Sequence, residues 1–195
     1  MKKLVIASNN AGKLREFQFL LQPLGVEVLT QAALGIAEAE EPHVTFVENA
    51  LAKARHVSRL SGLPALADDS GLCVEALGGA PGVFSARYAG EPKSDQRNNE
   101  KLLREMQDAT DRRAHYYCVL VLLRHADDPQ PLIAEGQWHG EIARQPAGDG
   151  GFGYDPLFWL PKLGKMSAEL EREQKHAISH RGKALAVLLE KLKTS

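Results

Sequence analysis

Residues 3–21 read KLVIASNNAGKLREFQFLL, and three kinds of pattern follow one another in this stretch. The first five residues form a short β-rich run, which predicts a strand. After Lys13 the apolar residues recur at helical spacing, at Leu14, Phe17, Leu20, Leu21 and Leu24. We therefore predict a strand, a loop over residues 8–13 and then a helix.

The predicted loop, S-N-N-A-G-K, has the properties of an anion-binding segment. It would present the open N–H groups of a helix N-terminus, its side chains are short, and Lys13 adds a positive charge. An ordinary strand-to-helix turn is the alternative interpretation. The segment is not a Walker A loop, because Ala7 replaces the first glycine and Leu14 replaces the magnesium-binding hydroxyl. A phosphate bound here would need a metal held by another part of the chain.

Length and composition limit the possible classes of protein. The 195 residues are 44% hydrophobic, which suits one domain over residues 1–195 or two tightly joined lobes. The 24 lysines and arginines balance 25 aspartates and glutamates and are mixed along the chain, which argues against a nucleic-acid groove or a membrane-binding face. No apolar run is long enough to span a bilayer or to act as a signal peptide, so we expect a cytoplasmic protein. Cys73 and Cys118 lie in apolar runs, and we expect both to be reduced core residues.

The order of the predicted elements indicates the fold class. Helical periodicity marks three further helices, over residues 45–60, 95–106 and 178–192. Strands are expected over residues 27–29, 65–67, 116–124 and 131–142. Strands and helices alternate early and two long strands follow, so we predict an α/β protein with a long mixed sheet flanked by helices.

Two adjacent carboxylates, Asp68 and Asp69, follow the buried strand predicted over residues 65–67. Carboxylates at the carboxyl end of a sheet strand are common at α/β active sites, and a turn at Ser70-Gly71 would bring both near one cation. A turn with solvated charges is the alternative interpretation.

A second acidic segment precedes the helix predicted from Thr45. Thr45 has the spacing to open a capping box, whereas Glu40 and Glu41 lie in the loop before it and have no such structural role. Lys53 lies on the following helix, where its ammonium group could meet phosphate oxygens. A solvated lysine is the alternative there.

Two other patterns match known motifs but carry little weight. G-D-G-G-F-G at residues 148–153 satisfies the dinucleotide-binding spacing, yet it runs into Pro156 where a helix would be required. His176 and His180 have the spacing of zinc ligands but lack the catalytic glutamate between them. We expect neither a dinucleotide site nor a zinc site.

Six motifs taken together resemble one family. They are S-N-N-A-G-K at 8–13, T-F-V-E-N-A-L-A-K-A at 45–54, A-D-D-S-G-L at 67–72, P-G-V-F-S-A-R-Y at 81–88, G-G-F-G-Y-D-P-L-F at 150–158 and S-H-R-G-K-A at 179–184. In this order, over nearly the whole chain, they resemble the inosine triphosphate pyrophosphatase family, the noncanonical purine nucleoside triphosphate pyrophosphatases, in its bacterial form. The resemblance implies a homodimer whose active-site cleft lies between two lobes. It also implies Mg²⁺-dependent hydrolysis of inosine, deoxyinosine and xanthosine triphosphates (ITP, dITP and XTP) to the nucleoside monophosphate and pyrophosphate.

The resemblance also implies roles for individual residues. The triphosphate would be bound by Ser8, Asn9, Asn10, Ala11, Gly12, Lys13 and Lys53, and Ser70 would be a further substrate contact. Mg²⁺ would be held by Glu41, Asp68 and Asp69, with Glu40 as the alternative to Glu41 and with Asp69 also the general base. Base recognition would fall on Phe152, Gly153, Tyr154, Asp155, Lys175, His180 and Arg181.

The residue types suit that chemistry. Hydrolysis of a phosphoanhydride requires charge neutralisation, alignment and an oriented water rather than covalent catalysis. Lys175 and Arg181 would donate hydrogen bonds to the C6 carbonyl of hypoxanthine or xanthine and would disfavour the amino group of adenine. Two other classes stay open, a nucleotide-binding regulatory protein without turnover and a pyrophosphatase directed at pyrimidine nucleotides.

Overall fold

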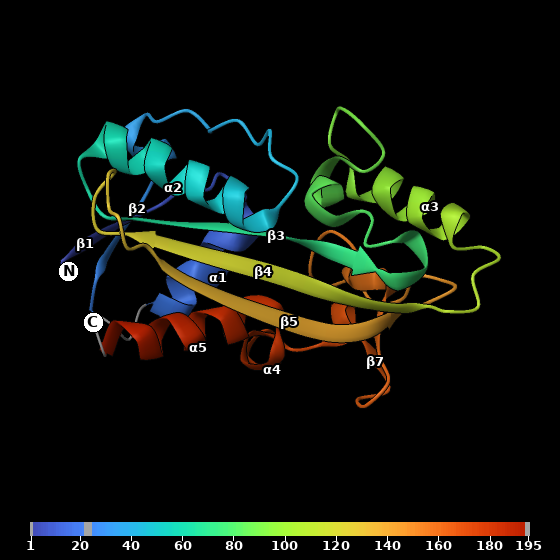
Figure 1. Ribbon diagram of the computed structural model, residues 1–195. Coiled ribbons are helices and arrows are strands. Elements are labelled where there is room, and N and C mark those ends of the chain that lie inside the picture. Colours follow the sequence, from blue (N-terminus) through green and yellow to red (C-terminus); the bar gives the residue numbers. More distant parts are fainter. Residues whose placement is uncertain (1, 22–24, 194–195) are drawn as a thin grey trace. The chain divides into compact units, whose positions relative to one another are not determined.

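The computed structural model describes residues 2–21 and 25–193, and the strands within these ranges form one seven-stranded sheet (Figure 1). The strands are β1 (Lys3–Ile6), β2 (Glu27–Thr30), β3 (Ala65–Val74), β4 (Arg113–Leu123), β5 (Leu132–Ile142), β6 (Phe158–Leu160) and β7 (Lys165–Met166). Their order in the sheet is β2-β1-β3-β4-β5-β6-β7. Strand β1 pairs in parallel with β2 and β3, whereas β6 pairs antiparallel with β5 and β7. The predicted mixed sheet of an α/β protein is confirmed, although β6 and β7 are too short for their periodicity to have been recognised.

The helices match the predicted periodicity except that α1 begins earlier than predicted, α4 was not predicted and α5 begins later than predicted. The α-helices within the described ranges are α1 (Ala11–Leu21), α2 (Phe46–Ser61), α3 (Asp95–Glu105), α4 (Arg172–Ile178) and α5 (His180–Lys193). Short 3-10 helices are η2 (Ala32–Leu34), η3 (Glu75–Leu77), η4 (Gly82–Arg87), η5 (Asp155–Leu157) and η6 (Ser167–Glu169). The helix predicted from Ile178 begins at His180 instead, because extended Ser179 separates it from α4. Leu24 and the side chain of Leu20, both used in the prediction of α1, lie outside what the structure describes.

The chain divides into two compact units, each with its own hydrophobic core. The first unit comprises the described parts of Met1–Asp69, Cys118–Gly136 and Arg181–Ser195. The second comprises Ser70–Tyr117 and Gln137–His180. A single functional domain over residues 1–195 stays a prediction.

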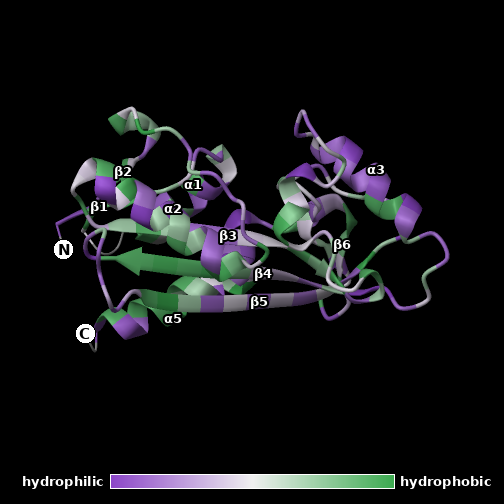
Figure 2. Cartoon of the chain, turned by 45° about the horizontal axis from the view of Figure 1, so that its top comes forward, coloured by the Kyte–Doolittle hydropathy of each residue, from purple (hydrophilic) through white to green (hydrophobic). Residues whose placement is uncertain are grey.

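In the first unit both faces of the sheet are covered. Helices α1 and α5 lie on one side of it and α2 lies on the other (Figure 1). Leu66 and Leu120 pack with Phe17 of α1 and Leu185 of α5 in one core. Strand β4 is buried at every position over residues 118–123, as expected for a strand covered on both faces, and this part of β4 is green in Figure 2.

The core of the second unit is built around aromatic side chains. The ring centres of Tyr116 and Phe158 lie 4.7 Å apart, and those of Trp138 and Phe158 lie 5.3 Å apart. Leu102 of α3 and Met106, which directly follows this helix, belong to the same cluster. Burial of these apolar side chains stabilises the second unit.

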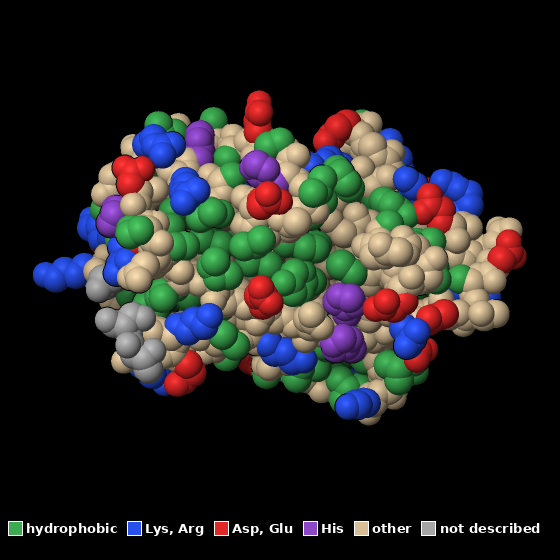
Figure 3. Space-filling view, in the orientation of Figure 1, with side chains coloured by type: hydrophobic (Ala, Val, Ile, Leu, Met, Phe, Trp, Pro, Cys, Tyr) green, Lys and Arg blue, Asp and Glu red, His purple; other side chains and the backbone are tan. Residues whose placement is uncertain are grey.

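On the face drawn in Figure 3, lysines and arginines are interspersed with aspartates and glutamates, so neither charge forms a large patch. Among the helices that the structure describes, none is both long and apolar enough to cross a membrane.

Candidate active site

The N-terminal loop is shorter than the sequence predicted, because α1 already begins at Ala11. Asn10 sets this boundary as the N-cap residue. Its Oδ1 accepts hydrogen bonds from the N–H groups of Gly12, at 2.9 Å, and Lys13, at 3.1 Å. The loop prediction is therefore wrong for Ala11, Gly12 and Lys13. An anion at this helix end would use other donors or displace the Asn10 carboxamide, because the cap already satisfies two of the open N–H groups.

Ser8, Asn9 and Asn10 remain between β1 and α1. Ser8 Oγ accepts a hydrogen bond from the N–H of Asn10 at 3.2 Å. Asn9 and Asn10 are exposed and Ser8 is half-buried. Short polar side chains thus lie directly before the positive end of a helix dipole, which suits phosphate oxygens.

Asp68 and Asp69 lie within β3 rather than at its end. The strand continues through Ser70-Gly71 to Val74, so the predicted turn is wrong. The physical reason is that Leu72 and Val74 are buried apolar residues on one face of the sheet, and their burial continues the strand beyond Gly71. Because successive side chains of a strand point to opposite faces of the sheet, the two carboxylates meet different helices.

Lys53 of α2 brings Glu41 and Asp69 together. Its Nζ lies 2.8 Å from Glu41 Oε1 and 3.0 Å from Asp69 Oδ1, and its side chain is 12% exposed. Burial alone lowers the pKa of Lys53, but the carboxylates of Asp69, Asp68 and Glu41 outweigh it and raise that pKa above its ordinary value. Burial raises the pKa of Asp69 against the opposing charges of Lys53 and Lys13. A carboxylate with a raised pKa is a stronger proton acceptor than an ordinary one.

The structure favours Glu41 over Glu40 as the carboxylate of this cluster. Glu41 is half-buried and contacts the α2 lysine, whereas Glu40 is exposed. The loop that carries Glu41 is attached to α2 by Asn49, whose carboxamide accepts from the N–H of His43 at 3.0 Å and donates to its carbonyl at 3.1 Å. Thr45 caps the helix through its Oγ1, as predicted.

Asp68 points to the other side of the sheet, where two cations surround it. Its Oδ2 lies 3.0 Å from Lys13 Nζ and 3.4 Å from both Nε and Nη2 of Arg181. Burial alone raises the pKa of Asp68, but the charges of Lys13, Arg181 and Lys53 hold it well below its ordinary value. Asp68 is therefore ionised and anchors the lysine that was predicted to bind phosphate.

Sequence reasoning missed Glu16, which completes this buried group. Glu16 pairs with Nη1 of Arg181, and that guanidinium is only 2% exposed. The available signal was position, because Glu16 follows Lys13 by three residues on α1 and so shares its face. The predicted contact of Arg181 with a purine stays a prediction, and the structure gives its guanidinium two carboxylate partners.

Two of the carboxylates in the first unit have the properties of Mg²⁺ ligands. Carboxylate oxygens suit this ion, and Asp69 Oδ2 is buried with no hydrogen-bond partner in the described part of the chain. Within residues 2–21 and 25–193, no three or more His, Cys, Asp and Glu side chains are grouped so as to hold a metal. Mg²⁺ is commonly held by one or two carboxylates together with substrate phosphates, a mode that Glu41 and Asp69 fit. Asp68, predicted as a further ligand, is engaged instead by Lys13 and Arg181.

In the second unit, Asp155 is the centre of a second polar cluster and is only 3% exposed. Its Oδ2 accepts hydrogen bonds from the N–H of Phe152, at 2.8 Å, and from Lys175 Nζ, at 2.5 Å, while its Oδ1 accepts from Ser167 Oγ at 2.7 Å. Lys175 Nζ also lies 5.2 Å from the centre of the Phe152 ring. Three residues predicted for base recognition, Phe152, Asp155 and Lys175, are thus brought together.

Tyr154 and His180 are buried parts of the same unit. The Tyr154 hydroxyl donates to the carbonyl of Ser85 at 2.8 Å. The His180 ring stacks on Tyr116, with ring centres 4.8 Å apart and planes 11° apart. Their predicted contacts with a purine, like that of half-buried Ser70 with the substrate, stay predictions.

The glycines before Asp155 allow the loop to close around its carboxylate. Gly151 has φ +80°, and a Cβ at this position would lie 2.1 Å from Asp155 Oδ2. Gly164 supplies a matched comparison, because it has φ +62° but no atom within 4 Å of its Cβ position. The backbone conformation alone therefore explains why residue 164 is a glycine. At position 151 a glycine is also required because the Asp155 carboxylate lies so close to its Cα.

We expect Gly151→Ala to lower the free energy of unfolding by about 3 kcal/mol, because it combines an unfavourable φ with a collision against a buried carboxylate. Gly164→Ala should cost about 1 kcal/mol, the backbone contribution alone. Urea unfolding of the two variants and the parent measures the difference. Equal losses in the two variants would contradict the close-approach explanation.

The model of the Ham1 family matches residues 4–191. This range contains the polar groups around Lys53, Asp68 and Asp155. The chain belongs to the Ham1 family. The resemblance identified from the motifs is confirmed.

Relatives and solved structures resemble this Ham1 chain over nearly its whole length. A dITP/XTP pyrophosphatase of Nitrosomonas europaea is 68% identical over 192 residues, which cover 98% of this chain and 95% of the relative. One of Ralstonia nicotianae is 66% identical, covering 99% and 98%. The structure of a HAM1 protein from Coxiella burnetii has a TM-score of 0.93 and 48% identity over 100% of both chains. That of the Staphylococcus aureus Ham1 protein has a TM-score of 0.88 and 43% identity over 99% of both.

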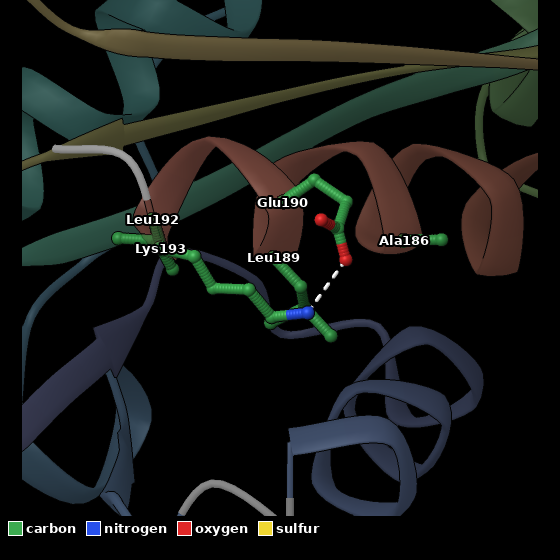
Figure 4. Close-up of a pocket in the computed structure, with 5 residues that line it drawn as sticks. All are labelled: Ala186, Leu189, Glu190, Leu192 and Lys193. Atoms are coloured by element: carbon green, nitrogen blue, oxygen red, sulfur yellow. Dashed lines mark hydrogen bonds and ion pairs between the residues drawn. The ribbon is translucent and has the colours of Figure 1, made fainter.

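A surface pocket of the Ham1 chain lies on α5 and contains none of the predicted site residues (Figure 4). It is lined by Ala186, Leu189, Glu190, Leu192 and Lys193. Glu190 and Lys193 pair with each other at 2.6 Å, and the other lining side chains are apolar. This lining lacks the convergent cations that a triphosphate requires.

The two cysteines of the Ham1 chain are free thiols. Cys118 is buried, as predicted, and burial raises its pKa well above the ordinary value. Cys73 is only half-buried, so the prediction of a core position is wrong for it. The reason is that the side chain of Cys73 lies on the face of β3 opposite to buried Leu72 and Val74.

Proposed function

We propose that this chain hydrolyses noncanonical purine nucleoside triphosphates, namely ITP, dITP and XTP, to the nucleoside monophosphate and pyrophosphate. The observation that carries the proposal is the convergence of Glu41 and Asp69 on Lys53 at 2.8 and 3.0 Å. Paired carboxylates and buried lysines are the charges that phosphoanhydride hydrolysis requires. Relatives 68% and 66% identical are named dITP/XTP pyrophosphatases. Such an enzyme removes deaminated purines from the nucleotide pool.

The triphosphate would be bound by the cations of the first unit. Lys53 contacts Glu41 and Asp69 and has enough donors to contact phosphate oxygens as well. Lys13 is oriented by Asp68 and lies in the first turn of α1, close to the exposed polar residues that precede the helix. Positive charge is thereby supplied from two helices, α1 and α2.

Asp69 is the residue proposed to accept a proton from the attacking water. Oxygen of that water bonds to the α-phosphorus, the bond from the α-phosphorus to the bridging oxygen breaks, and pyrophosphate leaves. The raised pKa of Asp69 suits proton acceptance, and its Oδ2 makes no hydrogen bond to any described residue.

Glu41 and Asp69 are proposed to hold Mg²⁺, which when bound supplies charge neutralisation for the phosphates. In the present arrangement Lys53 balances both carboxylates. Lys53 therefore holds the Glu41 and Asp69 side chains close together and balances their negative charge.

We expect Glu41→Gln to raise the Mg²⁺ concentration needed for half-maximal activity about tenfold or more, because a neutral amide oxygen binds a hard cation less well than a carboxylate. Glu40→Gln is the matched control, and its Mg²⁺ titration should follow that of the parent. Pyrophosphate release as a function of Mg²⁺ measures both. A shifted titration in Glu40→Gln with an unchanged one in Glu41→Gln would move the ligand to Glu40.

The base is proposed to be recognised by the cluster around Asp155. The Phe152 ring offers a stacking surface, and Lys175 retains N–H donors beyond the one that it gives to Asp155. Obligate donors can donate hydrogen bonds to the C6 carbonyl of hypoxanthine and xanthine, whereas the amino group of adenine would face them unfavourably. This arrangement favours noncanonical purines over ATP.

A panel of nucleoside triphosphates tests the proposed function. The purified chain with Mg²⁺ should release pyrophosphate from ITP, dITP and XTP with kcat/KM about a hundredfold or more above the values for ATP and GTP. Tight binding without pyrophosphate release would indicate a regulatory nucleotide-binding protein. Preferred hydrolysis of pyrimidine triphosphates would indicate the other pyrophosphatase class. Equal efficiency on all purine triphosphates would overturn the assignment of the base cluster.

Two further properties are proposed: a homodimeric state, which the family resemblance implies, and the cytoplasmic location expected from the sequence. Both remain predictions. Sedimentation equilibrium of the purified chain tests the first, and fractionation of cells that express it tests the second.

A further inference from the structure

The N-terminal half of α3 holds the main chain of Gly153 from both sides. The N–H of Gly153 donates to Asp95 Oδ2 at 2.7 Å, and its carbonyl accepts from Asn99 Nδ2 at 2.9 Å. Asp95 and Asn99 are four residues apart on one helix, so their side chains share a face. Both polar groups of one peptide residue are thus occupied by side chains that lie 58 and 54 positions earlier in the sequence.

Packing by itself does not restrain Gly153. Its φ is +64°, a conformation that favours glycine, and no atom lies within 4 Å of where a Cβ would be. Its neighbours are held differently, because the Phe152 N–H is bound by Asp155 and the Tyr154 hydroxyl is bound by the Ser85 carbonyl. The two hydrogen bonds from α3 are therefore what fixes the peptide groups of Gly153.

Helix α3 is itself firmly attached to the second unit. Asn98 is 2% exposed, and its Nδ2 donates to the carbonyls of Ser85, at 3.3 Å, and Ala86, at 3.1 Å. Its Oδ1 accepts from the N–H of Ala89 at 2.8 Å. Ser94 caps the helix by accepting from the N–H of Arg97. Asp95 and Asn99 therefore project from an element that is held on its own account.

We propose that Asp95 and Asn99 are positioning residues that set nucleobase discrimination by holding the base loop, residues 152–155, and by occupying both main-chain groups of Gly153. The inference rests on the proposed function, in which this loop contacts the purine. A free peptide group offers one donor and one acceptor and can pair with any purine edge. With its N–H bound by Asp95 and its carbonyl bound by Asn99, the Gly153 peptide is held in one orientation. Loss of either hydrogen bond would let it turn and accept a hydrogen bond from the 2-amino group of guanine, which hypoxanthine lacks.

The test compares variants of α3 on two substrates. Asp95→Ala and Asn99→Ala each remove one of the two hydrogen bonds, and each should lower the ratio of kcat/KM for ITP over GTP about tenfold, mainly through a higher KM for ITP. The kcat for ITP should stay within about threefold of the parent, because neither residue contacts Lys53, Glu41 or Asp69, which are proposed to act on the phosphates. Asp95→Asn keeps an acceptor oxygen in the same place and should retain the parent ratio. Gln96→Ala, on the same helix turn but bonded to Glu100, is the matched control.

A purely structural role predicts a different result. Loss of folded protein would lower kcat for ITP and GTP together and leave their ratio unchanged, and that outcome in both alanine variants would overturn the proposal. Amide hydrogen exchange of residues 152–154 without nucleotide supplies a readout that does not depend on activity. It should be faster in Asp95→Ala and Asn99→Ala than in the parent and Gln96→Ala, and unchanged exchange would also overturn the proposal. The parent chain separates the two claims, because failure of the parent to prefer ITP overturns the proposed function itself.

Discussion

Asp69→Asn is expected to lower the rate of pyrophosphate release from ITP by about 10²–10⁴-fold at saturating Mg²⁺, the usual loss when a general base is removed. The substitution keeps the shape of the side chain, but it removes a negative charge and the proton acceptor. Asp69 lies in the middle of β3 and contacts Lys53 at 3.0 Å, so the change acts where the two proposed carboxylate ligands converge. Binding of ITP itself should persist, because Lys13 and Lys53 remain.

Single-turnover kinetics and calorimetric titration with ITP measure the two parts of this expectation separately. Asp127→Asn is a suitable control, since the Asp127 side chain is 89% exposed, and its rate should equal that of the parent. If Asp69→Asn keeps more than half of the parent rate, Asp69 is not the base. If it loses binding as well as turnover, the carboxylate is needed to assemble the site rather than to accept a proton.

Arg181→Ala is expected to lower the free energy of unfolding by about 3–5 kcal/mol, the range for breaking a buried ion pair from one side. The guanidinium lies between Glu16 and Asp68, and its removal would leave two buried carboxylates with less positive charge around them. A buried carboxylate that has lost its cationic partner is no longer compensated for its lost hydration, so the loss of stability should be large.

Chemical denaturation measures this loss, with Arg15→Ala as the control. Arg15 is exposed and precedes Glu16 on α1, so its removal should change stability by no more than about 0.5 kcal/mol. The combination Glu16→Gln, Asp68→Asn and Arg181→Met removes all three charges and should recover part of the stability lost in Arg181→Ala. A loss below about 1 kcal/mol in Arg181→Ala would contradict the buried network.

The fold was largely predictable because periodicity is a local property. Helices α2 and α3 begin and end within one residue of their predicted limits, and β4 is buried on both faces where the apolar run predicted it. The errors occur where a neighbouring segment decides the outcome. Ser70-Gly71 reads as a turn, but the pairing of β3 carries the strand through it. Strands β6 and β7 are short and form by pairing, β6 with β5 and β7 with β6, so their own residues did not predict them.

The sequence was sufficient to predict which residue types are present at the candidate site: a short polar segment with a lysine between a strand and a helix, adjacent carboxylates, and a glycine-rich loop that ends in Asp155. Motif spacing was enough for these, because each lies within a few consecutive residues. The partners of these residues depend on how the chain folds. The tertiary structure separates Asp68 from Asp69 across the sheet, selects Glu41 over Glu40, and joins Glu16 to Arg181 across 165 positions of sequence. Such pairings depend on which elements pack together. The residues next to a side chain in the sequence therefore do not indicate which distant residue it contacts after folding.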